Sequence, residues 1–457
     1  MVTPSITKVG KSQRQDAQGG AIALCGNHGA DVRHKSMAVY RFISIISHGI
    51  TPVALAATLL LIVGCTGGQL KQARDAFFID GDPDTAVQML ESDNGSGLSG
   101  LLFDMEKGLL LHYGGRFEES IAQLRQASAL MERQDYLSIS QQATSMVAND
   151  WMTQYKGEYC ERLWVHTYLI INYLMVRQYE DALVEAKQAL KVFDTYPEAL
   201  SDAYFSMALI GLCYEMLGEF NDAYIVYKRL VDMMPDPAPI RELVLRMGSL
   251  SGIEPESDSA MPDSYAVAGQ RDDISGQGEL IVFAGMGNGP VKEAGNIVLP
   301  PGVRISFPRY ANRSEAAGHF QLNTGNQPLP GNAVSTDLNR VARISLGRRA
   351  AQVALKQTAR VIAKEAIARK IGRKNDEIVG LMARMVLMAL EEADTRSWQT
   401  LPATNTLLRL SLDPGRHQLT LSVGSRTIDL PPFTLEKGQR IFYMVRSTGR
   451  FTAVYGR

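Results

Sequence analysis

Residues 204 to 235 read YFSMALIGLCYEMLGEFNDAYIVYKRLVDMMP, and this stretch decides how the first half of the chain folds. Apolar residues recur every three to four positions on both sides of Gly218, which predicts two helices joined by a tight turn. Two small residues, Gly211 and Ala223, let the backbones of antiparallel helices approach each other. Aromatic residues fill the space beside them. The stretch therefore predicts a helical hairpin.

The same stretch closely resembles a tetratricopeptide repeat. Seven residues stand at the positions of that motif: Gly211, Tyr214, Gly218, Phe220, Ala223, Tyr227 and Pro235. The frame recurs upstream on residues 163–194 and 101–128. A weaker copy, GDPDTAVQML, places Ala86 34 residues before Ser120, which is the period of the repeat. We therefore expect four helical hairpins with insertions between them.

In such solenoids the first helices of successive repeats form a concave surface. The residues expected to face it are Tyr113, Trp164, Leu174, Met175, Phe205, Leu212 and Met216. An open surface of this kind would be an apolar patch that binds a partner protein. The alternative is that residues 129–160, an insertion, fold into the groove and cover it. The sequence favours neither the open groove nor the covered one.

The body of the chain holds two cysteines, Cys160 and Cys213. Counted in the repeat frame, Cys160 stands eleven or twelve positions earlier in its hairpin than Cys213 does in the next one. At 1.5 Å per residue this is an axial offset of roughly 18 Å. A disulfide requires Cα atoms within about 7 Å of each other. We therefore expect two free, largely buried thiols.

An uncharged apolar stretch from Gly49 to Gly64 precedes Cys65. It is shorter than the roughly 20 residues of a membrane span and fits the core of a signal peptide. Met37 begins a leader of ordinary length, so residues 1–36 read as a start-site artefact. The sequence Ile62-Val63-Gly64-Cys65 matches the bacterial lipobox, which predicts lipidation of Cys65 and stable membrane anchoring. Thr66 favours the outer membrane, facing the periplasm.

The second half changes pattern after a Ser-, Asp- and Pro-rich linker. Short strands are expected near 279–284, 304–307, 406–412, 418–423, 427–430, 440–446 and 451–455, and two inserted helices near 348–371 and 376–392. The fold class is α+β multidomain: an α-solenoid of tetratricopeptide-like hairpins, then a β-rich, sandwich-like domain. Residues 1–36 are expected to be a start-site artefact or disordered, and 37–64 a signal peptide. The helical domain is expected at 65–250, a linker at 251–278 and the α+β domain at 279–457.

The two halves carry opposite charge. Residues 66–278 hold 16 Lys and Arg against 33 Asp and Glu, a net of −17, whereas residues 279–457 hold 25 against 13, a net of +12. Two consequences are open: the halves dock on each other, or a basic face meets anionic lipid or cell-wall polymer. The basic helix at 348–374 would suit nucleic acid in a cytosolic protein, but the export signal disfavours that reading.

No credible active site is evident. The turn GMGNGP after residue 284 lacks the spacing and the following helix of a dinucleotide site. The four histidines after residue 65 are scattered, without metal-ligand spacing. We therefore expect no enzyme activity, no cofactor and no metal site.

Three strings together resemble one family of uncharacterised bacterial lipoproteins: YKGEYCERLWVHTYLIINYL at 155–174, GELIVFAGMGNGPVKE at 278–293 and ADTRSWQTLPATNTLLRLSLDPGRHQLTL at 393–421. The resemblance implies an exported, lipid-anchored protein with tetratricopeptide-like helices before a mixed domain. Some members accompany outer-membrane activators of peptidoglycan synthases. Within ADTRSW, Asp394, Arg396 and Trp398 form either a functional surface or, as the favoured interpretation, an ion pair beside a buried tryptophan.

These observations predict a non-enzymatic outer-membrane lipoprotein whose helical repeats bind an envelope protein. The alternative is a factor that binds or processes cell-wall polymer through the basic C-terminal half, with anionic lipid or peptidoglycan as its partner.

Overall fold

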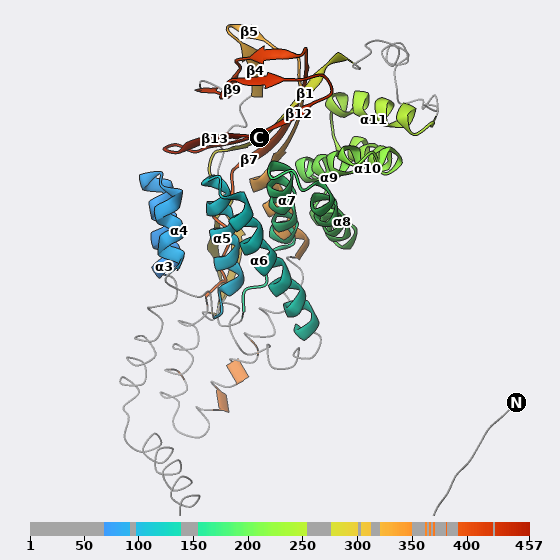
Figure 1. The fold of residues 1–457 in the computed structure, drawn as a ribbon. Coiled ribbons are helices and arrows are strands. Elements are labelled where there is room, and N and C mark those ends of the chain that lie inside the picture. The colour runs from blue at the N-terminus through green and yellow to red at the C-terminus, as the bar shows by residue number, and fades with distance from the viewer. Residues whose placement is uncertain are drawn as a thin grey trace, which may run out of the picture. The chain divides into compact units, whose positions relative to one another are not determined.

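The computed structural model describes the chain from residue 68 onward in sections (Figure 1). These are residues 68–91, 97–138, 154–253, 276–299, 303–311, 320–349, 392–423 and 426–457, with residues 362, 365, 366, 369, 370 and 381 in addition. Residues 66–457 form one compact unit. No helix among the described residues is both long and apolar enough to cross a bilayer.

The first half of the described chain is helical. Its helices are α3 (Gly68–Asp75), the π-helical turn η1 (Ala76–Asp80), α4 (Pro83–Glu91), α5 (Gly100–Tyr113), α6 (Phe117–Ser138), α7 (Tyr159–Met175), α8 (Tyr179–Thr195), the 3-10 turn η3 (Pro197–Ala199), α9 (Tyr204–Met216), α10 (Phe220–Met233) and α11 (Ala238–Leu250). Successive helices pack as hairpins: α3 on α4, α5 on α6, α7 on α8 and α9 on α10. The expected tetratricopeptide-like helical region is therefore confirmed.

Gly211 explains how closely the α9–α10 hairpin packs. A Cβ atom at this position would lie 2.3 Å from the ring of Tyr227 on the opposite helix. Gly218 has a φ of +73° at the turn, in the left-handed region that a glycine adopts without strain. Gly108 plays the same part in α5, where a Cβ would lie 2.6 Å from Leu124 of α6. The small residues predicted at the crossings are thus required there.

The second half is built of strands. They are β1 (Gly278–Met286), β2 (Lys292–Leu299), β3 (Val303–Tyr310), β4 (Phe320–Thr324), β5 (Gln327–Pro328), β6 (Asn332–Asp337), β7 (Thr404–Leu412), β8 (Gly415–His417), β9 (Thr420–Val423), β10 (Arg426–Asp429), β11 (Phe433–Leu435), β12 (Arg440–Ser447) and β13 (Thr452–Gly456). A five-stranded sheet has the order β13-β12-β1-β7-β6, and a four-stranded sheet has the order β10-β9-β4-β5. In the larger sheet, β1 pairs with β12 in parallel and with β7 antiparallel.

The central strand β1 is buried on both faces, because alternate side chains enter two different cores. Ile281 and Phe283 join the core that contains the helices. Leu280, Val282 and Ala284 join a second core together with residues of the four-stranded sheet. The larger sheet therefore lies between the helices and the smaller sheet. This explains why residues 280–284, LIVFA, are apolar without alternation.

The shared core changes the expected domain division. The helical half and the strand half were expected as separate domains, at 65–250 and 279–457, whereas one continuous core joins the helices to β1, β7 and β12. Several strands, including β2, β4 and β6, were not expected. The residues 338–349 form a helix that begins ten residues before the expected start, because Asp337 caps it by accepting a hydrogen bond from Arg340 N.

Some expectations lie outside the described residues. The leader, Cys65 and the linker from residue 254 to 275 are among them, as are most of the two inserted helices at 348–371 and 376–392. Cys160 and Cys213 are described, and both are free and buried as expected.

Candidate functional site

The predicted partner groove is filled by the chain itself. Tyr113, Trp164, Leu174, Met175, Phe205 and Leu212 are all buried, and Met216 is half-buried. Tyr113 donates a hydrogen bond to the backbone carbonyl of Thr400 (3.0 Å), and Phe205 N donates to Thr336 Oγ1 (2.8 Å). Of the two alternatives, the open groove therefore does not hold, and for Tyr113 and Phe205 the C-terminal half supplies the contacts. The other alternative was that the insertion at 129–160 covers the groove. Residues 139–153 of that insertion lie outside the described residues.

Residues 396–401, which include a turn at 399–400, contact α5 and α7 and are held largely through their main chain. The buried carboxylate of Glu106 on α5 accepts hydrogen bonds from Gln399 N (3.0 Å) and Thr400 N (3.3 Å). Glu161 on α7 accepts one from Trp398 N (2.8 Å). Arg74 of α3 bonds both Glu106 and the carbonyl of Ser397. The inner face of the helices therefore holds this segment of the same chain largely through its backbone.

The two interpretations of ADTRSW can now be compared with the structure. Asp394 and Arg396 form an ion pair with a 2.7 Å contact. Trp398 is completely buried and packs beside Tyr168, with ring centroids 6.0 Å apart. These contacts are those of the interpretation that the sequence favoured, an ion pair beside a buried tryptophan.

A buried ionic cluster joins α9 to the central sheet. Arg409 of β7 donates two hydrogen bonds to the carboxylate of Glu215, at 2.8 and 2.9 Å, and Arg440 of β12 donates a third at 2.6 Å. Glu279 of β1 pairs with both arginines. Burial alone would raise the pKa of Glu215, but the guanidinium groups outweigh it and lower the pKa to about 2.

A second buried cluster joins α7 to β2. Lys292 Nζ lies 2.6 Å from Glu158 Oε1, and both side chains are almost entirely buried. Arg349 pairs with the other oxygen of the same carboxylate at 2.9 Å. Burial opposes the charge on Lys292, yet the adjacent carboxylates of Glu158 and Glu161 raise the pKa of Lys292 above its ordinary value.

In both clusters a buried carboxylate of the helices, Glu158 or Glu215, pairs with basic groups of the strand half. Sequence reasoning missed Glu106, Glu161 and Glu215, yet a signal was present. Each is a carboxylate within a predominantly apolar first helix of a hairpin, and in α9 Glu215 is the sole charged residue. A charge in such a position has to meet a partner, because burying it alone is costly.

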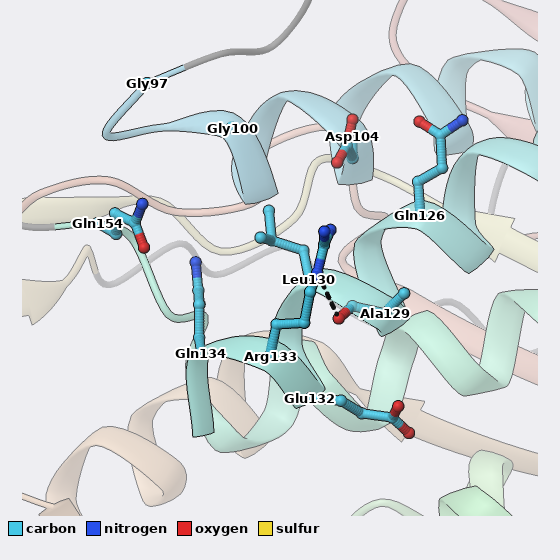
Figure 2. A pocket seen from close by; sticks show the side chains of 10 residues that line it. All are labelled: Gly97, Gly100, Asp104, Gln126, Ala129, Leu130, Glu132, Arg133, Gln134 and Gln154. Carbon is cyan, nitrogen blue, oxygen red and sulfur yellow. Dashed lines mark hydrogen bonds between the residues drawn. The ribbon is translucent and has the colours of Figure 1, made fainter. Parts of the chain in front are cut away.

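A pocket of about 720 Å³ lies between the start of α5 and the end of α6 (Figure 2). Its wall includes Asp104 and Gln126 toward one end and Gln134 and Gln154 toward the other. Burial raises the pKa of Asp104 to about 6, although a hydrogen bond from Gln123 opposes that shift. Gln134 Oε1 is buried and has no hydrogen-bond partner among the described residues.

The glycine-rich turn GMGNGP makes contacts that stabilise the fold. In GMGNGP, Gly289 N donates to the carbonyl of Leu401 (2.7 Å), and a Cβ at this glycine would lie 2.3 Å from that oxygen. The turn is thus packed against the backbone of residue 401. Within the described part of the chain, no group of three or more His, Cys, Asp or Glu side chains could hold a metal ion.

No protein-family model and no curated protein matches this chain. Solved structures with weak similarity include a kinesin light chain with nearly identical TPR-like repeats from Podosopora anserina, 16% identical, covering 45% of this chain and 96% of that one, with a TM-score of 0.31. MamA from Desulfovibrio magneticus RS-1 is 13% identical over 40% of this chain and 84% of its own, with a TM-score of 0.28. The MamA protein AMB-1 is 15% identical over 44% and 94%, also at 0.28. The repeat assignment rests on the hairpin contacts of α5 to α10.

Proposed function

We propose that this chain is a non-enzymatic, lipid-anchored protein of the bacterial envelope that acts as a protein-binding scaffold. The lipobox at Ile62 to Cys65 supports an anchor on the Cys65 thiol, in the outer membrane and facing the periplasm. The resemblance to bacterial lipoproteins extends the proposal to an envelope protein linked to cell-wall synthesis as the partner.

One observation supports the scaffold function: the helical hairpins hold a segment of their own chain largely through its main chain. Glu106 and Glu161 accept three hydrogen bonds from backbone N–H groups of residues 398–400 and one from the Thr400 hydroxyl. Main-chain hydrogen bonds are a common source of affinity in peptide recognition. In this chain the inner face serves its own C-terminal half, so a partner meets the outer face.

The outer face carries matching apolar residues in successive hairpins. Val184 of α8 and Ile225 of α10 each stand two residues after the small residue of the repeat, and they are 55% and 56% exposed. Lys187 and Lys228 follow them at the same spacing in both helices. The outer face thus repeats one pattern of apolar and basic groups, as a surface that binds along several repeats does.

Site-specific photo-crosslinking in intact cells tests the scaffold. A photoreactive residue placed at Val184 or at Ile225 should give discrete protein adducts. The same residue at Asp429, which is exposed on β10, is the control. If both helix positions give no adduct beyond that of the control, the scaffold proposal is wrong.

The anchor has its own test. Cys65→Ser should abolish incorporation of labelled palmitate and release the chain from the membrane fraction. Retention of the lipid label after this substitution would refute both the anchor and the assigned compartment.

A further inference from the structure

The pocket between α5 and α6 holds two acceptors that the described chain leaves incompletely bonded. Gln134 is 5% exposed, and its Oε1 has no hydrogen-bond partner among the described residues. Leaving such an acceptor unpaired is unfavourable, because the group has lost its water without gaining a donor. Asp104 Oδ1 accepts a hydrogen bond from Gln123 Nε2 (2.7 Å), whereas Asp104 Oδ2 accepts no hydrogen bond from the described residues. Both acceptors line the same pocket.

The surface between these acceptors suits a short aliphatic chain and a carbonyl group. In Figure 2, Leu130 and Arg133 lie between the Asp104 end and the Gln134 end. Leu130 is half-buried, so it offers an apolar contact. Arg133 is exposed and uses its Nε–H on the carbonyl of Ala129 (3.3 Å), which leaves its remaining N–H groups to donate to a ligand.

The charges of the pocket favour a cation at one end. Asp104 is partly withdrawn from water, which raises its pKa to about 6, so it is mostly ionised at neutral pH. Lys107 and Arg133 also lower the pKa of Asp104, each by less than the Gln123 hydrogen bond does. The helical half carries a net charge of −17 between residues 66 and 278, which raises the local concentration of cationic groups.

We propose that this pocket binds an extended peptide segment of a partner protein that carries a lysine side chain. The lysine ammonium donates to the carboxylate of Asp104, and its methylene chain lies over Leu130. A main-chain amide N–H of the peptide donates to Gln134 Oε1, and Arg133 donates to a main-chain carbonyl. This inference rests on the proposed scaffold function, because it names a chemical feature of the protein partner.

Calorimetric titration of the full chain tests the assignment. The probes are acetyl-Ala-Ala-Lys-Ala-Ala-amide and the same peptide with its lysine Nε-acetylated, both at pH 7.5. We expect the acetylated peptide to bind about tenfold more weakly, since the donor to the Asp104 carboxylate loses its positive charge. Asp104→Asn should weaken the unmodified peptide about tenfold and abolish the preference. Gln134→Leu should weaken both peptides alike.

Glu118→Gln is the matched control, because it removes one exposed carboxylate from the first turn of α6, outside the pocket. Unfolding curves of each variant show that the fold is retained. Equal binding of the two peptides, no binding of either, or an equal loss in Glu118→Gln and Asp104→Asn would each overturn the assignment. So would binding of a neutral disaccharide such as chitobiose without binding of the peptides. If photo-adducts at Val184 and Ile225 persist in Asp104→Asn, the scaffold function holds even though the pocket assignment fails.

Discussion

The buried carboxylate of Glu215 is the sharpest place to perturb the contact between the two halves. Glu215→Gln keeps the shape of the side chain and removes its charge, which leaves Glu279 to neutralise both Arg409 and Arg440. The arginines lower the pKa of Glu215 from 4.5 to about 2. Because a tenfold change in acidity corresponds to 1.36 kcal/mol, the ionised form is stabilised by roughly 3 kcal/mol in the folded chain.

Removal of one partner from a buried ion pair costs about 3 to 5 kcal/mol, which agrees with this figure in order of magnitude. We expect Glu215→Gln to lower the free energy of unfolding in urea by about 3 kcal/mol at pH 7. Glu180→Gln, the same change at an exposed position of α8, should change it by less than about 0.5 kcal/mol.

The effect should depend on pH with a defined sign. The folded-state pKa of Glu215 is depressed, so its contribution is complete above its unfolded pKa of 4.5 and is lost as the pH falls toward 2. The difference between wild type and Glu215→Gln should therefore shrink between about pH 5 and pH 2. A loss below about 1 kcal/mol at pH 7, or a loss independent of pH, would refute the reasoning.

Further outcomes follow from single sites. Gly211→Ala should destabilise the chain by about 1 to 3 kcal/mol, because the added methyl group meets the Tyr227 ring; a urea midpoint equal to that of wild type would contradict the close packing. Trp398→Ala should cost about 3 to 5 kcal/mol, measured in the same way, and a loss under 1 kcal/mol would show that this side chain is not part of the core. Cys160 and Cys213 should not react with a thiol reagent until the chain unfolds, because burial raises the pKa of both thiols; rapid labelling of the native chain would disprove it.

The helical half could be predicted because the residues that determine each hairpin lie close together in the sequence. Gly211, Gly218 and Ala223 lie within 13 positions of one another, and each fixes a crossing or a turn inside one hairpin. The strands β1, β7 and β12 were also recognisable as apolar runs. Their pairing was not, since β1 pairs with β12, a strand that begins more than 150 residues later. No local pattern specifies such a register.

The candidate sites show the same limit. From the sequence, the apolar residues of the first helices were equally compatible with an open groove and with one covered by residues 129–160. Contacts such as those of Thr400 with Tyr113 and Glu106 show that the C-terminal half lies there instead. The pocket at Asp104 and Gln134 had no signal at all in the sequence, because its two ends come from different helices and neither residue belongs to a motif.

The internal ion pairs also bear on binding of cell-wall polymer by the basic half. Lys292 and Arg409 are buried against Glu158 and Glu215, so their charges are not available to an anionic polymer in the intact chain. A fragment of residues 279–457 would expose them, together with the apolar side chains of β1 that pack on the helices. Salt-sensitive binding of sacculi by that fragment would therefore reflect surfaces that the helices normally cover. The cell-wall alternative is supported only if the full chain binds sacculi as well as the fragment does.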